Sequence, residues 1–295
     1  MKRTLFGFIS SLALAACDPA PQSSVENINT TKTEIAQTET VAALPSIAST
    51  LSCLSDSGPI LALHRGRDKG LDQAENALET LKLAYEAGFI MGEVDIAQIK
   101  DRTIILFHDG VWEEKTTGRG VVAASTAGDL DKILLKTPRG EFTSYRPATL
   151  SQVLDWAKGK LYLEIDFKSS ANEADVVALI SNKNMGPQVI LIAYYPEQAA
   201  RLRALAPDMM ISVSPNAIDE TGDQLVWLGT DDISEDEEIF VRNPKTYTAF
   251  GQFSARRALP DNWRNVDILV TDYASELMGK IGQNQTDQER LADCR

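Results

Sequence analysis

Positive charge is scarce in this sequence. Of its 295 residues, 29 are Lys or Arg and 42 are Asp or Glu, so the formal net charge is −13 and the pI is near 4.7. We expect no nucleic-acid partner, because a phosphate backbone is bound by a basic face. An anionic substrate is still compatible with this charge if a metal ion or a local group of Arg and Lys side chains reverses its sign.

The apolar run near the N-terminus is too short to cross a bilayer as a mature helix. This run, TLFGFISSLALAAC, follows two basic residues and ends in small ones, which is typical of a signal peptide. Its end, Leu14 to Cys17, resembles the lipobox of bacterial lipoproteins, which are cut before a lipid-bearing cysteine. We expect a signal peptide over residues 1–16 and an exported lipoprotein, anchored through lipidated Cys17 on the periplasmic face of the cell envelope. Ordinary signal cleavage near Ala16 is the alternative.

Aromatic residues are nearly absent from the segment that follows. Residues 17–52 are rich in Ser, Thr, Gln, Glu and Pro. Such a segment cannot bury enough apolar area to offset its conformational entropy. We therefore predict a lipid-anchored flexible linker over residues 17–52 and one folded domain over residues 53–295.

Cysteine is rare as well, with three residues in the chain. If Cys17 carries lipid, Cys53 and Cys294 are left, and they bracket the predicted domain. In an oxidising compartment two such cysteines are often bridged. A disulfide that ties the two ends of the domain together is one expectation, and two unpaired thiols are the other.

Short apolar segments recur along the predicted domain, with helix-like stretches between many of them. The predicted strands are Pro59–His64, Gly92–Ile99, Thr103–His108, Leu161–Phe167, Gln188–Tyr194, Met209–Ser214, Gln224–Gly229, Thr246–Gly251 and Val266–Asp272. The predicted helices are Ala74–Ala87, Leu150–Ala157 and Glu197–Ala206.

This alternation predicts a parallel sheet with right-handed crossovers. If residues 103–108 form an added strand beside the second, eight strands remain, which favours an α/β fold of the TIM-like (β/α)8 barrel type. An open doubly wound sheet is the alternative, but neither G-x-G-x-x-G nor a P-loop follows the first strand. Residues 110–147, the longest connection, are expected to run over one end of the barrel.

Polar side chains lie at or near the ends of the first two parallel strands, and such barrels carry their chemistry at strand C-termini. His64, one of only two histidines, ends the first strand. Glu93 and Asp95 are two residues apart on the second strand and so face the same side. If they point inward, their buried charges need compensation. A divalent cation, Mg²⁺ or Ca²⁺, suits such hard oxygen ligands.

The next parallel strand repeats this pattern. Glu164, Asp166 and Lys168 alternate with apolar residues and therefore share a face. A carboxylate from this strand can join those of the second strand on one ion, and Lys168 can contact a phosphate. His108, the second histidine, ends the added strand and is followed by an aspartate.

Four motifs in this order resemble the glycerophosphodiester phosphodiesterase family: HRG, AENALETLKLAYEAG, GEVDIAQIKDRTIILFHD and KTTGRG. The resemblance is strongest over residues 60–120 and continues more loosely through ATLSQVLDWAKGKLYLEIDFK and VDILVTDY. It implies a TIM-like barrel with a bound divalent cation. It also implies hydrolysis of glycerophosphodiesters to glycerol 3-phosphate and an alcohol.

The resemblance further implies three groups of site residues. The acid/base pair is His64 and His108. The substrate contacts are Arg65, Lys168 and Glu75. The metal ligands are Glu93, Asp95 and Asp166, with Glu164 as an alternative.

Two departures from the family pattern affect this expectation. Alanine replaces Pro and Thr around Glu75, which leaves the position of that carboxylate open. Asp166 stands where the family has Glu, one methylene longer, so the metal distances are expected to differ. Other functions also stay open: a lysophospholipase D, a phosphatidylinositol phospholipase C-like enzyme, a non-catalytic ligand-binding lipoprotein, or a structural envelope protein.

Overall fold

The computed structural model describes residues 44–218, 224–241 and 246–294. The predicted signal peptide over residues 1–16 and the predicted linker as far as residue 43 lie outside these ranges. No helix among the described residues has both the length and the apolar character that membrane crossing requires.

The described residues form nine strands and nine α-helices. The strands are β1 (Ile60–Leu63), β2 (Met91–Gln98), β3 (Ile104–Leu106), β4 (Tyr162–Phe167), β5 (Val189–Ala193), β6 (Met210–Val213), β7 (Gln224–Trp227), β8 (Tyr247–Gln252) and β9 (Ile268–Thr271). The helices are α1 (Ile47–Leu54), α2 (Leu78–Glu86), α3 (Ala127–Leu130), α4 (Leu150–Ala157), α5 (Glu173–Asn182), α6 (Pro196–Leu205), α7 (Glu238–Val241), α8 (Ala274–Lys280) and α9 (Asp287–Ala292).

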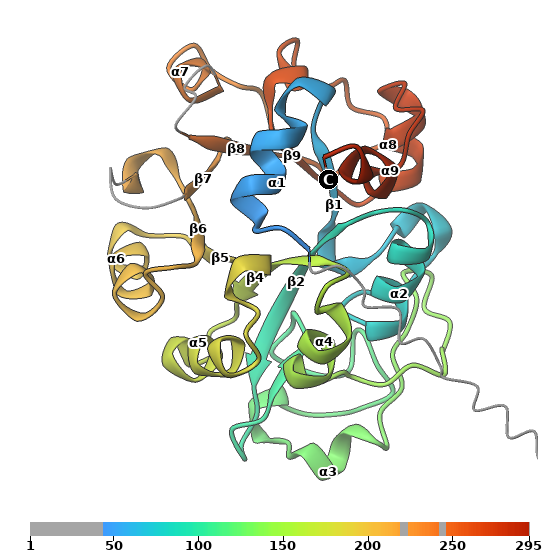
Figure 1. The fold of residues 1–295 in the computed structure, drawn as a ribbon. Coiled ribbons are helices and arrows are strands. Elements are labelled where there is room, and N and C mark those ends of the chain that lie inside the picture. Colours follow the sequence, from blue (N-terminus) through green and yellow to red (C-terminus); the bar gives the residue numbers. More distant parts are fainter. Residues whose placement is uncertain (1–43, 219–223, 242–245, 295) are drawn as a thin grey trace, which may run out of the picture. The chain divides into compact units, whose positions relative to one another are not determined.

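Eight of these strands are parallel and close into a barrel surrounded by helices (Figure 1). Strand β1 pairs in parallel with both β2 and β9, which joins the two ends of the sheet. Strand β3 pairs antiparallel with β2, outside the closed ring. The TIM-like barrel expected from the sequence, with β3 as an added strand, is confirmed.

The strands bury side chains on both of their faces. Val94 and Ile96 of β2 pack with residues of α4 and α5 in a cluster between the strands and the outer helices. Ala62, Tyr162 and other inward residues form a second cluster inside the barrel. Because side chains alternate along a strand, Glu93 and Asp95 lie on the inner face, where apolar residues would otherwise continue the core.

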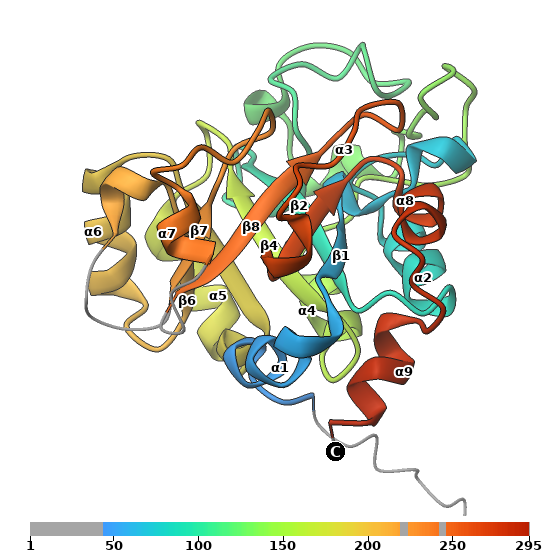
Figure 2. The same cartoon turned by 90° about the horizontal axis from the view of Figure 1, so that it is seen from above.

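Helix α1 closes the N-terminal end of the barrel, opposite the loops at the top of Figure 2. Ser46 caps its first turn, and Ile47, Leu51 and Leu54 are buried against the inner cluster. The linker predicted to reach residue 52 is therefore wrong for residues 47–52. Its composition is polar on average, but these three apolar residues recur at helical spacing and bury one face.

A disulfide joins α1 to the end of the chain. Cys53 and Cys294 are bonded, with their Cα atoms 6.1 Å apart. The bridge predicted between the two ends of the domain is confirmed.

Helix α2 begins later than the sequence indicated. A helix over residues 74–87 was expected, but the first turn starts at Leu78. Asn76 has φ of 53°, a left-handed conformation that ends any helix at that residue. Residues 74–77 instead form a turn at the mouth of the barrel.

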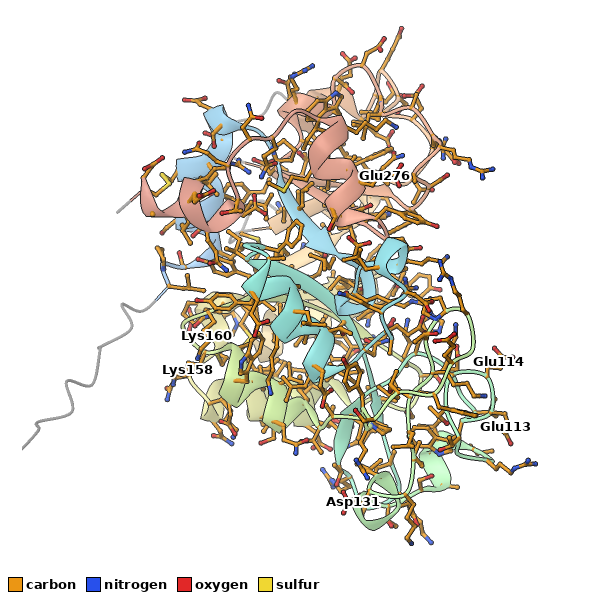
Figure 3. The ribbon with its side chains drawn as sticks, turned by 90° about the vertical axis from the view of Figure 1, so that its right-hand side faces the viewer. Glu113, Glu114, Asp131, Lys158, Lys160 and Glu276 are labelled. Carbon is orange, nitrogen blue, oxygen red and sulfur yellow. A yellow bond between two sulfur atoms is a disulfide. The ribbon has the colours of Figure 1, made fainter. Side chains whose placement is uncertain are left out.

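The long connection after β3 forms a small layer over the C-terminal end of the strands. It contains α3 and has an apolar cluster of its own around Trp112, Ile133 and Leu135. Figure 3 separates the two ends of the barrel: Lys158 and Lys160, which precede β4, lie at one end, and Glu113 and Glu114 of this connection lie at the other. The connection over residues 110–147 thus crosses one end of the barrel, as predicted.

Candidate active site

The turn after β1 presents two of the predicted site residues. Arg65 and Gly66 both have positive φ, 55° and 64°. A Cβ on Gly66 would lie 2.8 Å from Leu81 Cδ2, so only glycine fits this turn against α2. The tight turn holds His64 and Arg65 at the mouth of the barrel, which explains the glycine in the HRG motif.

The register of β2 on β4 aligns the carboxylates. Glu93 lies opposite Glu164, and Asp95 lies opposite Asp166. All four are buried. The structure therefore brings the two acidic strands together on the inner face, where both histidines, Arg65 and Lys168 line the same cavity.

Three of these carboxylates form a compact group. Glu93, Asp95 and Asp166 offer one oxygen each, all within 4.8 Å of one another. Glu164 is outside this group and hydrogen-bonds with Ser212, and burial raises the pKa of Glu164 to about 7. Of the two carboxylates of β4 that the sequence proposed as ligands, Asp166 is the one that joins Glu93 and Asp95.

Lys168 partly neutralises this group. Its Nζ lies 2.6 Å from Asp95 Oδ1 and 2.7 Å from Asp166 Oδ2. Burial acts to raise the pKa of Asp95, but the charge and hydrogen bond of Lys168 outweigh it, and the pKa lies below its ordinary value. Burial and the neighbouring charge of Asp95 hold the pKa of Glu93 well above its ordinary value. The side chains of the protein thus compensate the negative charge of Asp95, but they do not fully compensate a negative charge on Glu93.

The donor set fits a divalent cation. The cavity is lined by four carboxylates and two cationic side chains, Arg65 and Lys168. Buried Asp166 Oδ1 has no hydrogen-bond partner among the described residues. Hard oxygen donors with an excess of negative charge are the ligands that Mg²⁺ and Ca²⁺ take.

Each histidine is held by a carboxylate through Nδ1. His64 Nδ1 lies 2.9 Å from Asp272 Oδ1, and His108 Nδ1 lies 2.7 Å from Asp109 Oδ1. His64 Nε2 is 4.0 Å from Glu93 Oε2, on the cavity side of the ring. The Nδ1 atom of each histidine is therefore held by a carboxylate, and both rings line the cavity.

Glu75 lies against arginines. Its two carboxylate oxygens accept hydrogen bonds from Arg65 Nη1 at 2.9 Å and from Arg67 Nη2 at 3.3 Å. Burial acts to lower the pKa of Arg65, but the charges of Glu75 and Asp95 outweigh it, so that pKa is raised. The contacts present are those of a residue that positions Arg65, whereas the resemblance implied that Glu75 contacts the substrate.

Three further side chains hold residues of the site, and their roles were not predicted from the sequence. Asn76 donates to Asp95 Oδ2 at 2.7 Å and accepts from the Asp95 backbone N–H at 2.9 Å. The Tyr194 hydroxyl donates to Asp166 Oδ2 at 2.8 Å, and Asp272 holds His64. A signal for Asp272 was present, because it directly follows the last strand, which in a closed barrel lies beside the first.

The family model for the glycerophosphoryl diester phosphodiesterase family matches residues 64–213, half of the chain. The chain belongs to this family. The match begins at His64. It includes both histidines and every metal ligand and substrate contact that were predicted from the sequence.

Relatives in the glycerophosphodiester phosphodiesterase family are distant. The glycerophosphodiester phosphodiesterase of Caldanaerobacter subterraneus is 26% identical over 161 residues, which are 52% of this chain and 65% of the relative. YhdW of Bacillus subtilis is 28% identical over 144 residues, 47% of this chain and 59% of the relative. The chain thus spans less than two thirds of either curated relative.

Solved structures of the family share the fold. A glycerophosphoryl diester phosphodiesterase from Parabacteroides distasonis has a TM-score of 0.71 at 22% identity, covering 84% of this chain and 97% of that one. A glycerophosphodiester phosphodiesterase from Agrobacterium tumefaciens has a TM-score of 0.59 at 16% identity, covering 75% and 99%.

Proposed function

We propose that this protein is a divalent-metal-dependent phosphodiesterase that hydrolyses glycerophosphodiesters to glycerol 3-phosphate and an alcohol. One observation carries the proposal: oxygens of Glu93, Asp95 and Asp166 lie within 4.8 Å of one another in the cavity that both histidines line. A phosphodiesterase from Oleispira antarctica, similar at TM-score 0.53 and 16% identity, has been solved in complex with the product sn-glycerol-3-phosphate, which supports this choice of product.

The cavity provides for the negative charge of the substrate. Arg65 and Lys168 would contact the phosphoryl oxygens, where charge increases in the transition state. Glu93, Asp95 and Asp166 would hold the cation, which as a Lewis acid stabilises the same oxygens. Glu75 and Asn76 keep Arg65 and Asp95 in place through the hydrogen bonds described above.

The two histidines would move the two protons of the reaction. The attacking oxygen must lose a proton, and the leaving alkoxide must gain one. With a carboxylate at Nδ1, each ring keeps hydrogen there and directs Nε2 to the reaction: unprotonated Nε2 of the base accepts a proton, and protonated Nε2 of the acid donates one. The same carboxylate then stabilises the imidazolium that forms. One histidine, as base, takes the proton of the attacking water, and the other, as acid, gives a proton to the leaving alkoxide, so the hydrolysis balances.

The remaining walls of the cavity suit the glycerol arm. The cavity measures about 320 Å³ and is lined beyond the charged residues by aromatic, aliphatic and small polar side chains, among them Trp227 and Phe253. The Phe253 ring lies 4.5 Å from the His64 ring, centroid to centroid, and helps to fix its orientation. A three-carbon alcohol fits this space, with ring faces for its carbons and Ser212 and Ser214 for its hydroxyls.

The deciding experiment is a hydrolysis assay of the purified protein with and without a chelator. We expect release of choline and glycerol 3-phosphate from glycerophosphocholine, loss of activity in excess EDTA, and recovery with Mg²⁺ or Ca²⁺. Full activity in excess chelator would remove the metal from the proposal. Turnover of lysophosphatidylcholine but of no glycerophosphodiester would favour the lysophospholipase alternative, and the absence of any turnover would favour a binding protein.

We also propose that the chain acts in the bacterial cell envelope, anchored by lipid on Cys17. The lipobox-like sequence motivates this proposal, and a disulfide between Cys53 and Cys294 is compatible with an oxidising compartment. In cells fed labelled palmitate, we expect the label in the membrane-bound protein and its loss in Cys17→Ser. A label that persists in Cys17→Ser would refute the anchor.

A further inference from the structure

A second cavity adjoins the first at the mouth of the barrel. It measures about 370 Å³ and lies between the loop after β1 and the long connection of residues 110–147. We propose that it binds a phosphate monoester carried by the leaving alcohol, so that the preferred substrate is a glycerophosphodiester whose alcohol is itself phosphorylated. This inference rests on the proposed function.

The position of the second cavity fits the second arm of a diester. His64 and Arg65 line both cavities. A phosphodiester bound at these two residues has two ester arms, and because the pair lines both cavities, each arm can enter a different one. With glycerol in the first cavity, the alcohol extends into the second.

The charge of the second cavity selects the alcohol. Besides Arg65, its cationic residues are Arg67, Lys69, Lys115 and Lys136, against three carboxylates. This local excess of two positive charges occurs in a chain whose net charge is −13. A phosphate monoester carries nearly two negative charges at neutral pH and therefore gains most from this site.

Arg67 is a second arginine of this cavity, and it forms ion pairs with Glu75 and Asp272. Its side chain is 5% exposed, yet its Nε and Nη1 have no hydrogen-bond partner among the described residues. Nη1 is 3.5 Å from Asp272 Oδ1, beyond hydrogen-bond distance. Because Arg67 lines the cavity and its guanidinium is always charged, it adds a positive charge that attracts a phosphate bound there.

The carboxylates of this cavity make a cationic alcohol such as choline a less preferred arm than a phosphorylated one, although we still expect its diester to be hydrolysed. Glu75 already accepts hydrogen bonds from Arg65 and Arg67, and Asp272 from His64. The third, Glu114, belongs to the long connection and also lines the cavity. An ammonium group entering the cavity would find two of the three carboxylates already paired with cationic side chains, which outnumber the carboxylates by two.

Two lysines of the long connection, Lys136 and Lys132, provide a variant and a control to test this proposal. Lys136 Nζ donates to the backbone oxygen of Glu113 at 2.8 Å and lies over the Phe142 ring, apart from the hydrogen bonds that orient His64 and Arg65. Lys136→Gln removes its charge. Lys132→Gln is the matched control, because Lys132 lies on the same connection but is 77% exposed and does not line the cavity.

The probes are glycerophosphoglycerol and the same diester with a phosphate on the terminal hydroxyl of its alcohol. In the wild-type protein we expect a kcat/KM about fivefold or more higher for the phosphorylated diester. Lys136→Gln should lower this ratio about threefold, Lys132→Gln should leave it unchanged, and added salt should shrink it.

The outcomes separate the two proposals. If the wild-type protein hydrolyses both diesters with equal kcat/KM, or if Lys136→Gln leaves a ratio as high as the wild-type one, the second cavity is not a phosphate site and the proposed function is unaffected. If the wild-type protein hydrolyses neither diester, nor any other glycerophosphodiester, the proposed function itself fails, and this inference fails with it.

Discussion

The Nδ1 atom of His64 lies 2.9 Å from Oδ1 of Asp272. This contact joins the end of β1 to the end of β9, two strands that become neighbours only when the barrel closes. Burial acts to raise the pKa of Asp272, but the hydrogen bond and charge of His64, with the charges of Arg67 and Lys69, outweigh it and hold that pKa below its ordinary value. Asp272 is thus an anion at neutral pH, and it orients His64.

Replacing this anion should impair catalysis without unfolding the protein. In Asp272→Asn we expect kcat to fall on the order of 10²-fold, because the amide neither fixes the tautomer of His64 nor stabilises its imidazolium. The measurement is kcat and KM across pH, in which KM should change less than kcat. Asp56→Asn, an exposed change at the other end of the barrel, is the control. A kcat equal to the wild-type value would remove Asp272 from the mechanism.

The two histidines should each be required. We expect His64→Ala and His108→Ala to lower kcat by roughly 10²- to 10⁴-fold, the usual contribution of a general acid or base. Steady-state kinetics on glycerophosphocholine with saturating metal would measure this. Near-wild-type turnover in either variant would show that its imidazole transfers no proton in the limiting step.

Tyr194 should act through the metal site. Its hydroxyl donates to Asp166 Oδ2, so Tyr194→Phe removes a hydrogen bond from a carboxylate of the acidic group. We expect activation to need about tenfold more Mg²⁺ or Ca²⁺, with kcat at saturating metal close to the wild-type value. A metal titration of activity in chelator-treated protein measures this shift.

The neighbouring tyrosine provides the matched control for that titration. Tyr195 is 68% exposed and does not line the cavity. Tyr195→Phe should therefore leave the activation midpoint unchanged. Equal midpoints for both variants and the wild type would show that the Tyr194 hydroxyl does not position a metal ligand.

The sequence predicted those parts of the site that depend on local periodicity. Glu93 and Asp95 share a face because they are two residues apart, and this holds in any strand. The partners of His64 and Asp166 could not be predicted in this way, because Asp272 is 208 residues from His64 and Tyr194 is 28 residues from Asp166. Such contacts depend on the closure of the barrel, which brings distant strand ends to one rim.

The alternation of strands and helices was sufficient to predict the fold. The prediction was wrong in two places, one of which is a segment that was judged by its average composition. Ile47, Leu51 and Leu54 form the buried face of α1, but they lie in or beside a segment that is polar overall. The start of α2 was misplaced because Asn76 adopts a left-handed conformation that propensity alone does not reveal. For α1 the local sequence does contain the helical spacing, which the average composition concealed, whereas at Asn76 the hydrogen bonds with Asp95 accompany a conformation that the local sequence does not indicate.

The disulfide should stabilise the protein without contributing to catalysis. It closes a loop between residues 241 apart in sequence, which restricts the unfolded chain. We expect the double variant Cys53→Ser, Cys294→Ser to lose about 3 to 5 kcal/mol of unfolding free energy. Its kcat at 25 °C should be unchanged, because α1 lies at the end of the barrel opposite the cavity. Urea unfolding with and without reductant measures this, and a variant as stable as the oxidised wild type would contradict it.

Asp267 should make stability depend on pH. Burial raises its pKa to about 6, although Thr248 donates to its carboxylate through N–H and hydroxyl. Because the folded pKa exceeds the ordinary value of 3.8, the protonated group favours the folded state. That contribution is complete below pH 4 and is lost as pH rises through 6. Asp267→Asn removes the charge and keeps an oxygen acceptor for Thr248.

The difference in unfolding free energy between Asp267→Asn and the wild type should therefore change with pH. We expect it to shift by about 2 kcal/mol in favour of the variant between pH 4 and pH 7. Other titrating groups contribute equally to both proteins and cancel in the difference. Asp261→Asn, an exposed change nearby, should show no such shift. A constant difference for Asp267→Asn over this range would mean that Asp267 is ionised at no cost in the folded barrel.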